Sequence, residues 1–344
     1  MFWQIYEGTK KEWEDQFYIS NAHYRQSYDW GNYKSLMKWK VLRLVKIDNV
    51  ENKTLVQLTY KKYLFFCAAY IPGNICGKIE NLDKDFIKSV RQHTKSLFVY
   101  IRMDSNSKKL ESEEVTFKKN GWLRPLHKEH ASMSIEKVIG DTLENLKSGI
   151  SKSWKKNYNK SKRTFDKEKI LLTLSNKPNS DDLVQISSVM SKTKKIYNPH
   201  SKEEFDNLIK TLGSNTYFAT AYSSKGEPLG YRAFIYFKNR AWDLGAATSA
   251  QGRDLLVSYI ITINILEKAS SIGIKNYNFG AIDEAKKPGV YYFKKGVGTN
   301  EYSYSGEWEY SNLPFMRFFI NITIYIFMSD RLRRIIPFIN NYKF

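Results

Sequence analysis

The stretch YNFGAIDEAKKPGVYYFKKGVG, residues 277–298, gives the first indication of both fold and chemistry. It continues an apolar strand, residues 274–279, and then breaks into a loop rich in glycine, proline and acidic residues. The apolar run 290–293 predicts a second strand, followed directly by Lys294 and Lys295. Two lysines beside an aromatic segment are well placed to bind an anion, or to stabilise negative charge that develops during a reaction. The alternative is a turn between core strands with solvated lysines.

The segments on either side predict a mixed α/β domain. A hairpin of residues 229–237 and 241–246 leads into a long helix, 255–271, and then into the apolar strand. Strands, a loop, a helix and a further strand in this order are typical of acyltransferase domains of the GNAT type. A helix at 82–95 and a strand at 97–103 are the expected counterpart in the first half, although no sequence repeat supports a duplication.

The composition favours more than one domain and polyanionic partners. The chain has 344 residues, of which 42% are hydrophobic and 15% aromatic, so it can form two sizeable cores. Its formal net charge of +20 favours nucleic acid, phosphate-rich ligands or an anionic membrane surface. A lysine-rich compositional bias without function is the alternative.

Residue types that bind metals or form disulfides are sparse. Cys67 and Cys76 match neither a metal-binding pattern nor a disulfide framework, and the five histidines are scattered. We therefore expect no metal site and treat the histidines as structural or surface residues. The first residues lack the basic segment and apolar core of a signal peptide, which leads to the expectation of a cytoplasmic protein.

A basic segment near the middle of the chain is expected to form a helix. Residues 146–164 carry many lysines, and the next acidic residue is Asp166. Trp154 and Tyr158 lie four residues apart on one face of the expected helix. Lysines on such a helix bind the phosphates of a nucleic acid, or are simply solvated. The candidate phosphate-binding residues are Lys152, Lys155, Lys156, Lys160 and Lys162.

The C-terminal segment, residues 313–339, is apolar and aromatic with arginines interspersed. Its uninterrupted apolar run is too short to span a bilayer. We expect this segment either to pack on the second domain or to lie in the membrane interface, with its arginines at the lipid headgroups.

Several short motifs occur in the order seen in one protein family. They are QSYDWGNYK at 26–34, YIPG at 70–73, RMD at 102–104, GW at 121–122 and the stretch 277–298. Together they resemble the FemABX family, bacterial transferases that use aminoacyl-tRNA to add amino acids to peptidoglycan precursors. The resemblance covers residues 1–310. It implies two GNAT-like α/β domains in tandem, without the coiled-coil arm of some members.

The resemblance also implies roles for residues in the transfer itself. Phe293 and Lys294 resemble the pair at the acyl-transfer centre, where the lysine ammonium would stabilise the oxyanion and the departing ribose hydroxyl. Asp104 resembles a candidate base at the end of a strand. The lysines of the basic helix become candidate ligands of tRNA.

Further residues resemble the part of the family site that binds the precursor. Lys34 and Arg240 resemble the basic pair that binds its diphosphate, with Arg232 as a competitor for the second position. Tyr277 and Trp30 complete the expected substrate-binding set.

The chemistry implied by this resemblance is compatible with the composition. Aminoacyl transfer needs positioned substrates and a stabilised oxyanion, but no metal and no cofactor. GNAT enzymes hold the pyrophosphate of coenzyme A with a glycine-rich loop, and the segment SAQGRD at 249–254 lacks that glycine spacing. The chain also offers no convincing Cys-His or Ser-His pairing.

The expected function is the transfer of an amino acid from aminoacyl-tRNA to the peptide stem of a peptidoglycan precursor, either lipid-linked or UDP-linked. The alternatives are N-acylation of a nucleotide sugar or surface glycan by coenzyme A, and a non-catalytic, basic RNA-binding protein. The expected fold class is α/β (α+β), with GNAT-like domains at 1–145 and 171–312, a basic linker helix at 146–170 and an amphipathic tail at 313–344.

Overall fold

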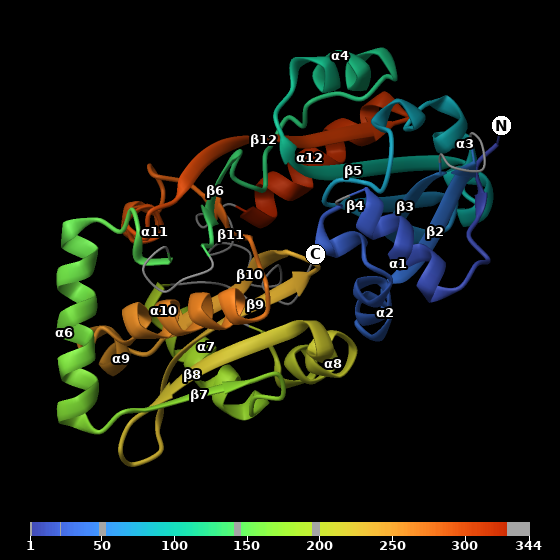
Figure 1. Cartoon of the computed structure of the whole chain (residues 1–344). Coiled ribbons are helices and arrows are strands. Elements are labelled where there is room, and N and C mark those ends of the chain that lie inside the picture. Colours follow the sequence, from blue (N-terminus) through green and yellow to red (C-terminus); the bar gives the residue numbers. More distant parts are fainter. Residues whose placement is uncertain (1, 21, 48–52, 141–145, 195–199, 329–344) are drawn as a thin grey trace. The chain divides into compact units, whose positions relative to one another are not determined.

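The computed structural model describes residues 2–20, 22–47, 53–140, 146–194 and 200–328, and it divides into two compact units (Figure 1). Unit 1 consists of Met1–Ser132 together with Tyr302–Phe344. Unit 2 consists of Met133–Glu301. Each unit contains a mixed sheet with helices packed on it, as the α/β class predicts.

The sheet of unit 1 has the strand order β1-β2-β3-β4-β5-β12. These strands are β1 (Gln4–Ile5), β2 (Lys40–Ile47), β3 (Lys53–Tyr63), β4 (Phe66–Pro72), β5 (Phe98–Lys108) and β12 (Asn300–Ser311). The described helices of this unit are α1 (Lys10–Ile19), α2 (Tyr28–Leu36), α3 (Lys84–Thr94), α4 (Glu111–Lys119) and α12 (Pro314–Met328). The core lies between sheet and helices and includes Phe86, Val99, Trp122 and Trp308.

The sheet of unit 2 has the strand order β6-β11-β10-β9-β8-β7. These strands are β6 (Met133–Val138), β7 (Leu171–Ser175), β8 (Thr216–Tyr222), β9 (Pro228–Phe237), β10 (Arg240–Thr248) and β11 (Asn276–Ile282). The helices, as far as they are described, are α6 (Lys152–Glu168), α7 (Ser180–Lys194), α8 (Lys202–Leu212), α9 (Ala250–Asp254), α10 (Val257–Ser271) and α11 (Pro288–Lys295). The apolar helix α10 packs on β8 and β9 and against α6.

The two sheets share one pattern of strand directions. In unit 1, β4 and β5 are parallel and are connected through α3, while β3 and β12 flank them antiparallel. In unit 2, β10 and β11 are parallel and are connected through α10, with β9 and β6 as antiparallel flanks. A parallel pair needs a crossover connection of this kind, which is why the strand, helix and strand order could be read from the sequence. The expected counterpart in the first half is confirmed.

The two units exchange the strands that complete their sheets. Strand β6 follows the first part of unit 1 in the chain but pairs with β11 of unit 2. Strand β12 follows unit 2 but pairs with β5 of unit 1 from Tyr304 to Ser311. The change of unit thus falls at residues 132 and 301, whereas the predicted boundaries were 145 and 312. Sequence periodicity marks a strand but not the sheet that it joins, which accounts for the difference.

Among the described helices, α6 is the longest with 17 residues, so none of them forms a long coiled-coil arm. The search for membrane-spanning helices over the same residues found none of sufficient length and apolarity.

Helix α12, from the predicted tail, belongs to unit 1 and not to the second domain. Its inward side is polar: Arg317 and Asn321, four residues apart, both bind the fully buried carboxylate of Glu309 on β12. The hydroxyl of Tyr100 donates a further bond to this carboxylate at 2.7 Å. Arg317 therefore does not reach outward to lipid headgroups as expected. Residues 329–339 of the predicted tail lie outside the described part of the chain.

We predict that the substitution Arg317→Met lowers the free energy of unfolding by about 3 kcal/mol, because it leaves the buried Glu309 carboxylate without its charged partner. Urea denaturation of the purified protein measures this change. The control is Lys118→Met, which removes the exposed ion pair with Glu114 at 3.0 Å and is expected to cost less than about 1 kcal/mol. Equal losses in both variants would contradict a structural role for the Arg317–Glu309 pair.

Candidate active site

The candidate site of unit 2 is built around a break in β11. The pairing of β11 with β6 shifts register between Asn278 and Ala281, and Gly280 between them has a φ of 76°. Glycine adopts this left-handed conformation without steric cost. A β-bulge of this kind re-aims the local backbone. The backbone carbonyls of Phe279 and Ala281 on either side of Gly280 both accept hydrogen bonds from Lys294.

Lys294 is held by helix α11 and not by the expected strand at 290–293. Pro288 occupies the first turn of α11, where its fixed φ and missing N–H favour a helix. The aromatic run that follows predicts a strand by its composition alone. On the helix, Lys294 directs its ammonium to the Phe279 carbonyl at 2.5 Å and to the Ala281 carbonyl at 3.2 Å.

Burial lowers the pKa of Lys294 to about 8, since removal from water disfavours the charged ammonium. The nearby Asp243 carboxylate acts in the opposite direction and favours the charge, while Arg232 and Lys287 disfavour it. Lys294 is thus a cation near neutral pH that can lose its proton in mildly alkaline solution. A charge with little water around it interacts more strongly with a reacting group than a solvated one does.

Lys295, its neighbour in sequence, has a different environment. Its ammonium forms an ion pair with Glu301 at 2.8 Å and a hydrogen bond to the Tyr291 hydroxyl at 2.8 Å. The hydrogen bonds to Glu301 and Tyr291 raise the pKa of Lys295. The two lysines of the motif are therefore chemically distinct.

A buried charged group lies next to Lys294. The Arg232 guanidinium on β9 pairs with the Asp243 carboxylate on β10 at 3.0 Å, and both side chains are nearly buried. The Tyr277 hydroxyl donates to the same carboxylate oxygen at 3.0 Å, and burial keeps the pKa of this phenol well above its usual value. Tyr277 is consequently a neutral donor that helps to fix Asp243.

Phe293 contributes one wall of this site. The Arg232 guanidinium lies over the Phe293 ring at 5.7 Å and over the Phe279 ring at 5.5 Å. Phe293 also contacts Trp154 of α6 and Tyr259 of α10, with ring centroids 5.9 and 5.1 Å apart. The predicted Phe293–Lys294 pair is thus placed between a buried arginine and an aromatic cluster.

Arg240 is not part of this arrangement. It begins β10 beside Asn276 and forms an ion pair with Glu136 at 3.3 Å. Along β11 the distance from Asn276 to Ala281, which contacts Lys294, is about 16 Å at the usual rise per residue. Arg232, the other candidate for binding the diphosphate, is the arginine that the structure brings to the Lys294 site.

The basic segment forms α6, which is packed into unit 2. Trp154, Ser161 and Phe165 form its buried face at helical spacing. The five candidate lysines, Lys152, Lys155, Lys156, Lys160 and Lys162, are all exposed. The helix therefore presents a continuous basic surface.

Unit 1 holds the motif at 26–34 through two buried glutamines. The Gln26 amide donates to the backbone carbonyls of Gln57 and Pro72, and the Gln57 amide donates to the carbonyl of Ser27. These bonds fix the start of α2, which carries Trp30 and Lys34 one turn apart. The Lys34 ammonium lies 5.9 Å from the Trp30 ring and 5.4 Å from the Trp39 ring.

Asp104 lies within β5 and not at the end of a strand as expected, because pairing with β12 extends β5 to Lys108. Its carboxylate is almost buried, 3.9 Å from the Arg25 guanidinium and 4.0 Å from Nδ1 of His130. The Arg25 guanidinium also lies over the Trp30 ring at 5.9 Å. Arg25 thus connects Asp104 to the predicted substrate-binding residues of α2.

His130 belongs to a charged network that sequence reasoning did not identify. Its Nδ1 lies 2.8 Å from the buried Glu307 carboxylate, which also pairs with Arg102 at 3.1 Å. Burial alone would lower the pKa of His130, but the bond to Glu307 and the charge of Asp104 outweigh it and raise the pKa. His130 lies at the surface, as expected of the histidines, and the Glu307 carboxylate orients its ring.

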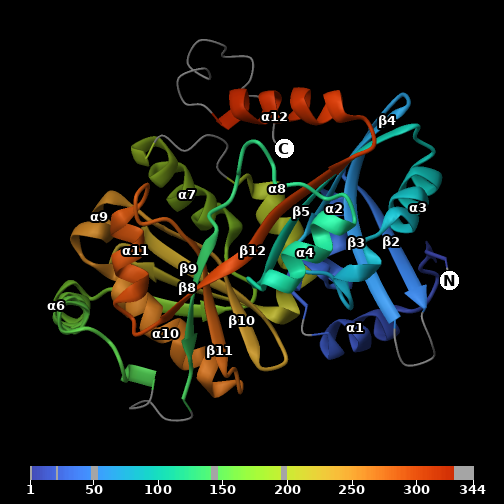
Figure 2. The ribbon, with the colours of Figure 1, turned by 90° about the horizontal axis from the view of Figure 1, so that it is seen from above.

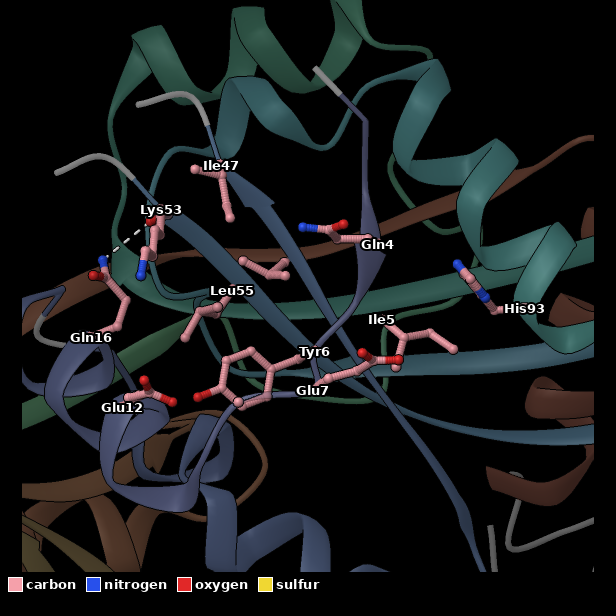
Figure 3. Close-up of a pocket in the computed structure, with 12 residues that line it drawn as sticks. Gln4, Ile5, Tyr6, Glu7, Glu12, Gln16, Ile47, Lys53, Leu55 and His93 are labelled. Carbon is pink, nitrogen blue, oxygen red and sulfur yellow. Dashed lines mark hydrogen bonds between the residues drawn. The ribbon is translucent and has the colours of Figure 1, made fainter. Parts of the chain in front are cut away.

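An open pocket of about 450 Å³ lies at the β1 edge of unit 1 (Figure 3). Its lining includes Tyr6, Glu12 and His93. The Glu12 carboxylate is engaged in capping α1, where it accepts from the backbone N–H of Thr9 at 2.7 Å. None of the predicted site residues lines this pocket, so we do not assign it to the candidate site.

The lowered pKa of Lys294 gives a direct prediction. In the ¹³C-methylated protein, the dimethylammonium signal of Lys294, identified by its loss in Lys294→Arg, should titrate near pH 8. Lys295 is the control, because its ion pair with Glu301 holds the proton to a higher pH. A Lys294 signal that titrates together with the exposed lysines would contradict the desolvated environment.

A scan of protein-family models gave no match for this chain, and a search of curated proteins found no match either. Solved structures share its fold at low identity. The crystal structure of FemX superposes with a TM-score of 0.76 and 14% identity, over 93% of this chain and 100% of that one. L-PGS from Bacillus licheniformis matches with a TM-score of 0.53 and 12% identity, over 90% of this chain and 95% of that one.

A third structure bears on the number of domains. The tandem GNAT protein from the clavulanic acid biosynthesis pathway matches with a TM-score of 0.50 and 8% identity, over 79% of this chain and 83% of that one. Its likeness agrees with the strand pattern that recurs in units 1 and 2. The chain therefore has the tandem GNAT-like α/β fold that is seen along its whole length in the structure of FemX.

Proposed function

We propose that this protein belongs to the FemABX family and transfers an aminoacyl group from tRNA to the peptide stem of a peptidoglycan precursor. The observation that carries the proposal is the position of Lys294, a desolvated ammonium at the β11 bulge beside the Arg232–Asp243 pair. The shared fold with FemX supports the proposal. The reaction takes place in the cytoplasm and uses no cofactor.

In this proposal Lys294 stabilises negative charge in the transition state. The amine of the acceptor attacks the ester carbonyl of the aminoacyl-tRNA, and the carbonyl oxygen becomes an oxyanion before the ribose hydroxyl leaves. A preorganised cation in a site with little water lowers the energy of this intermediate without having to reorganise. The Arg232–Asp243–Tyr277 group fixes the charge distribution around Lys294.

The network of unit 1 serves the acceptor. Within unit 1, Asp104 keeps the role of candidate base, because the acceptor amine must become neutral before it attacks, and its carboxylate lies 4.0 Å from Nδ1 of His130. Trp30 and Lys34 on α2 present an aromatic face and a cation to the rest of the precursor. Arg232 belongs to the transfer centre beside Phe293, whereas Arg240, the arginine expected to bind the diphosphate, pairs with Glu136 outside it.

The exposed lysines of α6 bind the phosphates of the tRNA. These lysines lie on helix α6, and Trp154 of the same helix contacts Phe293 beside Lys294. Helix α6 therefore carries the basic surface and also packs against the transfer centre of unit 2. Lysine binds phosphates as a point charge, which suits recognition of a nucleic-acid backbone.

Transfer from coenzyme A is the main alternative, and the likeness to a tandem GNAT protein favours it. The segment 249–254 folds as the short helix α9, in which the Ser249 side chain already accepts from the N–H of Gly252 at 3.0 Å. This arrangement differs from an open glycine loop. Ribonuclease treatment of an assay with charged tRNA distinguishes the two donors, because only tRNA-dependent transfer is abolished. Muropeptide analysis of a deletion strain by mass spectrometry then identifies the amino acid.

We predict that Lys294→Ala lowers turnover by about 100-fold, as the removal of one oxyanion donor does in other acyl transfers. The control is Lys295→Ala, which removes the ion pair with Glu301 and the hydrogen bond to Tyr291 but none of the Lys294 contacts, and should change turnover little. Steady-state kinetics with a soluble acceptor measures both. Unchanged turnover with a raised Michaelis constant in Lys294→Ala would remove Lys294 from the catalytic role.

We further predict that the triple variant Lys155→Glu, Lys156→Glu, Lys160→Glu raises the apparent Michaelis constant for aminoacyl-tRNA. It should also reduce the slope of log affinity against log salt, by about 0.7 to 0.9 for each phosphate that is no longer neutralised, because fewer counterions are released. Filter binding over a range of salt concentrations measures the slope.

The matched control reverses three exposed lysines of unit 1, Lys84, Lys88 and Lys119, and changes the net charge equally. If both variants shift the salt slope to the same extent, the effect comes from net charge and the α6 surface is merely solvated.

A further inference from the structure

Two segments of unit 1 that are far apart in sequence expose large apolar side chains on neighbouring parts of the surface. One is the tip of the β3–β4 hairpin, where Tyr63, Leu64 and Phe65 project into solvent and Leu64 is 86% exposed. The other is the outward face of α12, where five apolar side chains are between 38% and 58% exposed: Phe315, Phe318, Phe319, Ile322 and Tyr325.

Backbone and side-chain hydrogen bonds join these two segments through the start of β5. The carbonyl of Phe65 accepts from the N–H groups of Leu97 and Phe98, both exposed residues. The side chain of Asn312, two residues before α12 begins, donates to the Leu97 carbonyl and accepts from the N–H of Val99. The hairpin tip and the first turn of α12 therefore lie side by side, as Figure 2 shows at the end of α12 nearest β4.

The orientation of α12 is fixed by its polar side. Arg317 and Asn321 bind the buried Glu309, so the helix is held by polar groups and turns its apolar residues outward. A helix that only packs on a protein core has the opposite arrangement, with apolar residues inward. Five large apolar residues at i, i+3, i+4, i+7 and i+10 spacing form the outward stripe.

The charge of this surface is of one sign. The three segments that build it, residues 59–66, 91–98 and 312–328, contain no Asp or Glu, although the chain has 35 acidic residues. They do contain Lys61, Lys62 and Lys95, and the Lys62 ammonium donates to the Lys95 carbonyl at 2.7 Å beside the hairpin tip. Aromatic and aliphatic side chains flanked by lysines and free of carboxylates match the interface of an anionic bilayer.

We propose that the β3–β4 tip and the outward face of α12 together form a docking surface for an anionic lipid bilayer. The hairpin tip inserts beside the helix, which lies in the plane of the interface, and Lys62 and Lys95 contact the headgroups. This proposal goes beyond aminoacyl transfer and does not depend on it, since the surface is defined by unit 1 alone. It differs from the expectation based on sequence because it adds the β3–β4 tip and places Lys62 and Lys95 at the headgroups, whereas Arg317 binds Glu309.

The test is sedimentation of the purified full chain with vesicles of phosphatidylcholine, alone or mixed with phosphatidylglycerol. Deletion of α12 is unsuitable because it would uncover Glu309, so we use paired substitutions on the outward surface. Leu64→Ser with Phe65→Ser, and separately Phe318→Ser with Phe319→Ser, should each weaken binding to the anionic vesicles at least about tenfold. Lys62→Glu with Lys95→Glu should weaken binding to the anionic vesicles only.

The matched control is Ile19→Ser with Val115→Ser, which removes two similarly exposed apolar side chains from α1 and α4 and should leave binding unchanged. Circular dichroism and thermal unfolding verify that every variant is folded. The proposal is overturned if the wild-type protein does not sediment with anionic vesicles, or if the control weakens binding as much as the surface variants do. It is also overturned if the wild-type protein is a dimer that the α12 variants dissociate, because a second copy would then cover the surface.

Discussion

The candidate site depends on the placement of one positive charge at a break in a strand. The β11 bulge turns two carbonyl oxygens toward Lys294, and these dipoles, with Asp243, keep an ammonium in place where burial disfavours it. The balance is close, because burial dominates and the pKa falls to about 8. A more exposed lysine would be surrounded by water and would stabilise an oxyanion less, whereas a more deeply buried one would be neutral at physiological pH. The bulge supplies the two carbonyl oxygens, helix α11 places the ammonium against them, and the Arg232–Asp243 pair contributes one charge of each sign nearby.

The fold class and the order of the elements could be predicted from the sequence, because both depend on local periodicity and on short connections. The type of the segment at 290–293 could not, since β-branched and aromatic residues favour a strand while Pro288 and the tertiary contacts of Phe293 favour a helix. The choice between Arg232 and Arg240 also required the structure, because both lie on the same hairpin and only the register decides which one faces Lys294.

Of the network in unit 1, only Asp104 was indicated by the sequence, through the family resemblance, and its partners were not. His130 and Glu307 are separated by 177 residues in the chain, and no local pattern relates them. Only the pairing of β12 with β5 brings Glu307 opposite Asp104. The polarity of α12 was likewise hidden. Its sequence is mostly apolar, and only the burial of Glu309 reveals that Arg317 and Asn321 point inward.

The exchange of strands between the units also bears on how the molecule is made. A ribosome finishes residues 1–132 long before it reaches β12, and until then the edge of β5 has no partner on that side. An unpaired strand edge is a template for pairing with other chains. All of unit 2, from 133 to 301, must be synthesised first. The first residues of unit 1 are therefore synthesised before unit 2, but its sheet is completed only after unit 2. Chaperones have this long interval in which to bind unit 1. A truncation that removes β12 leaves the edge of β5 unpaired, although β5 itself is intact.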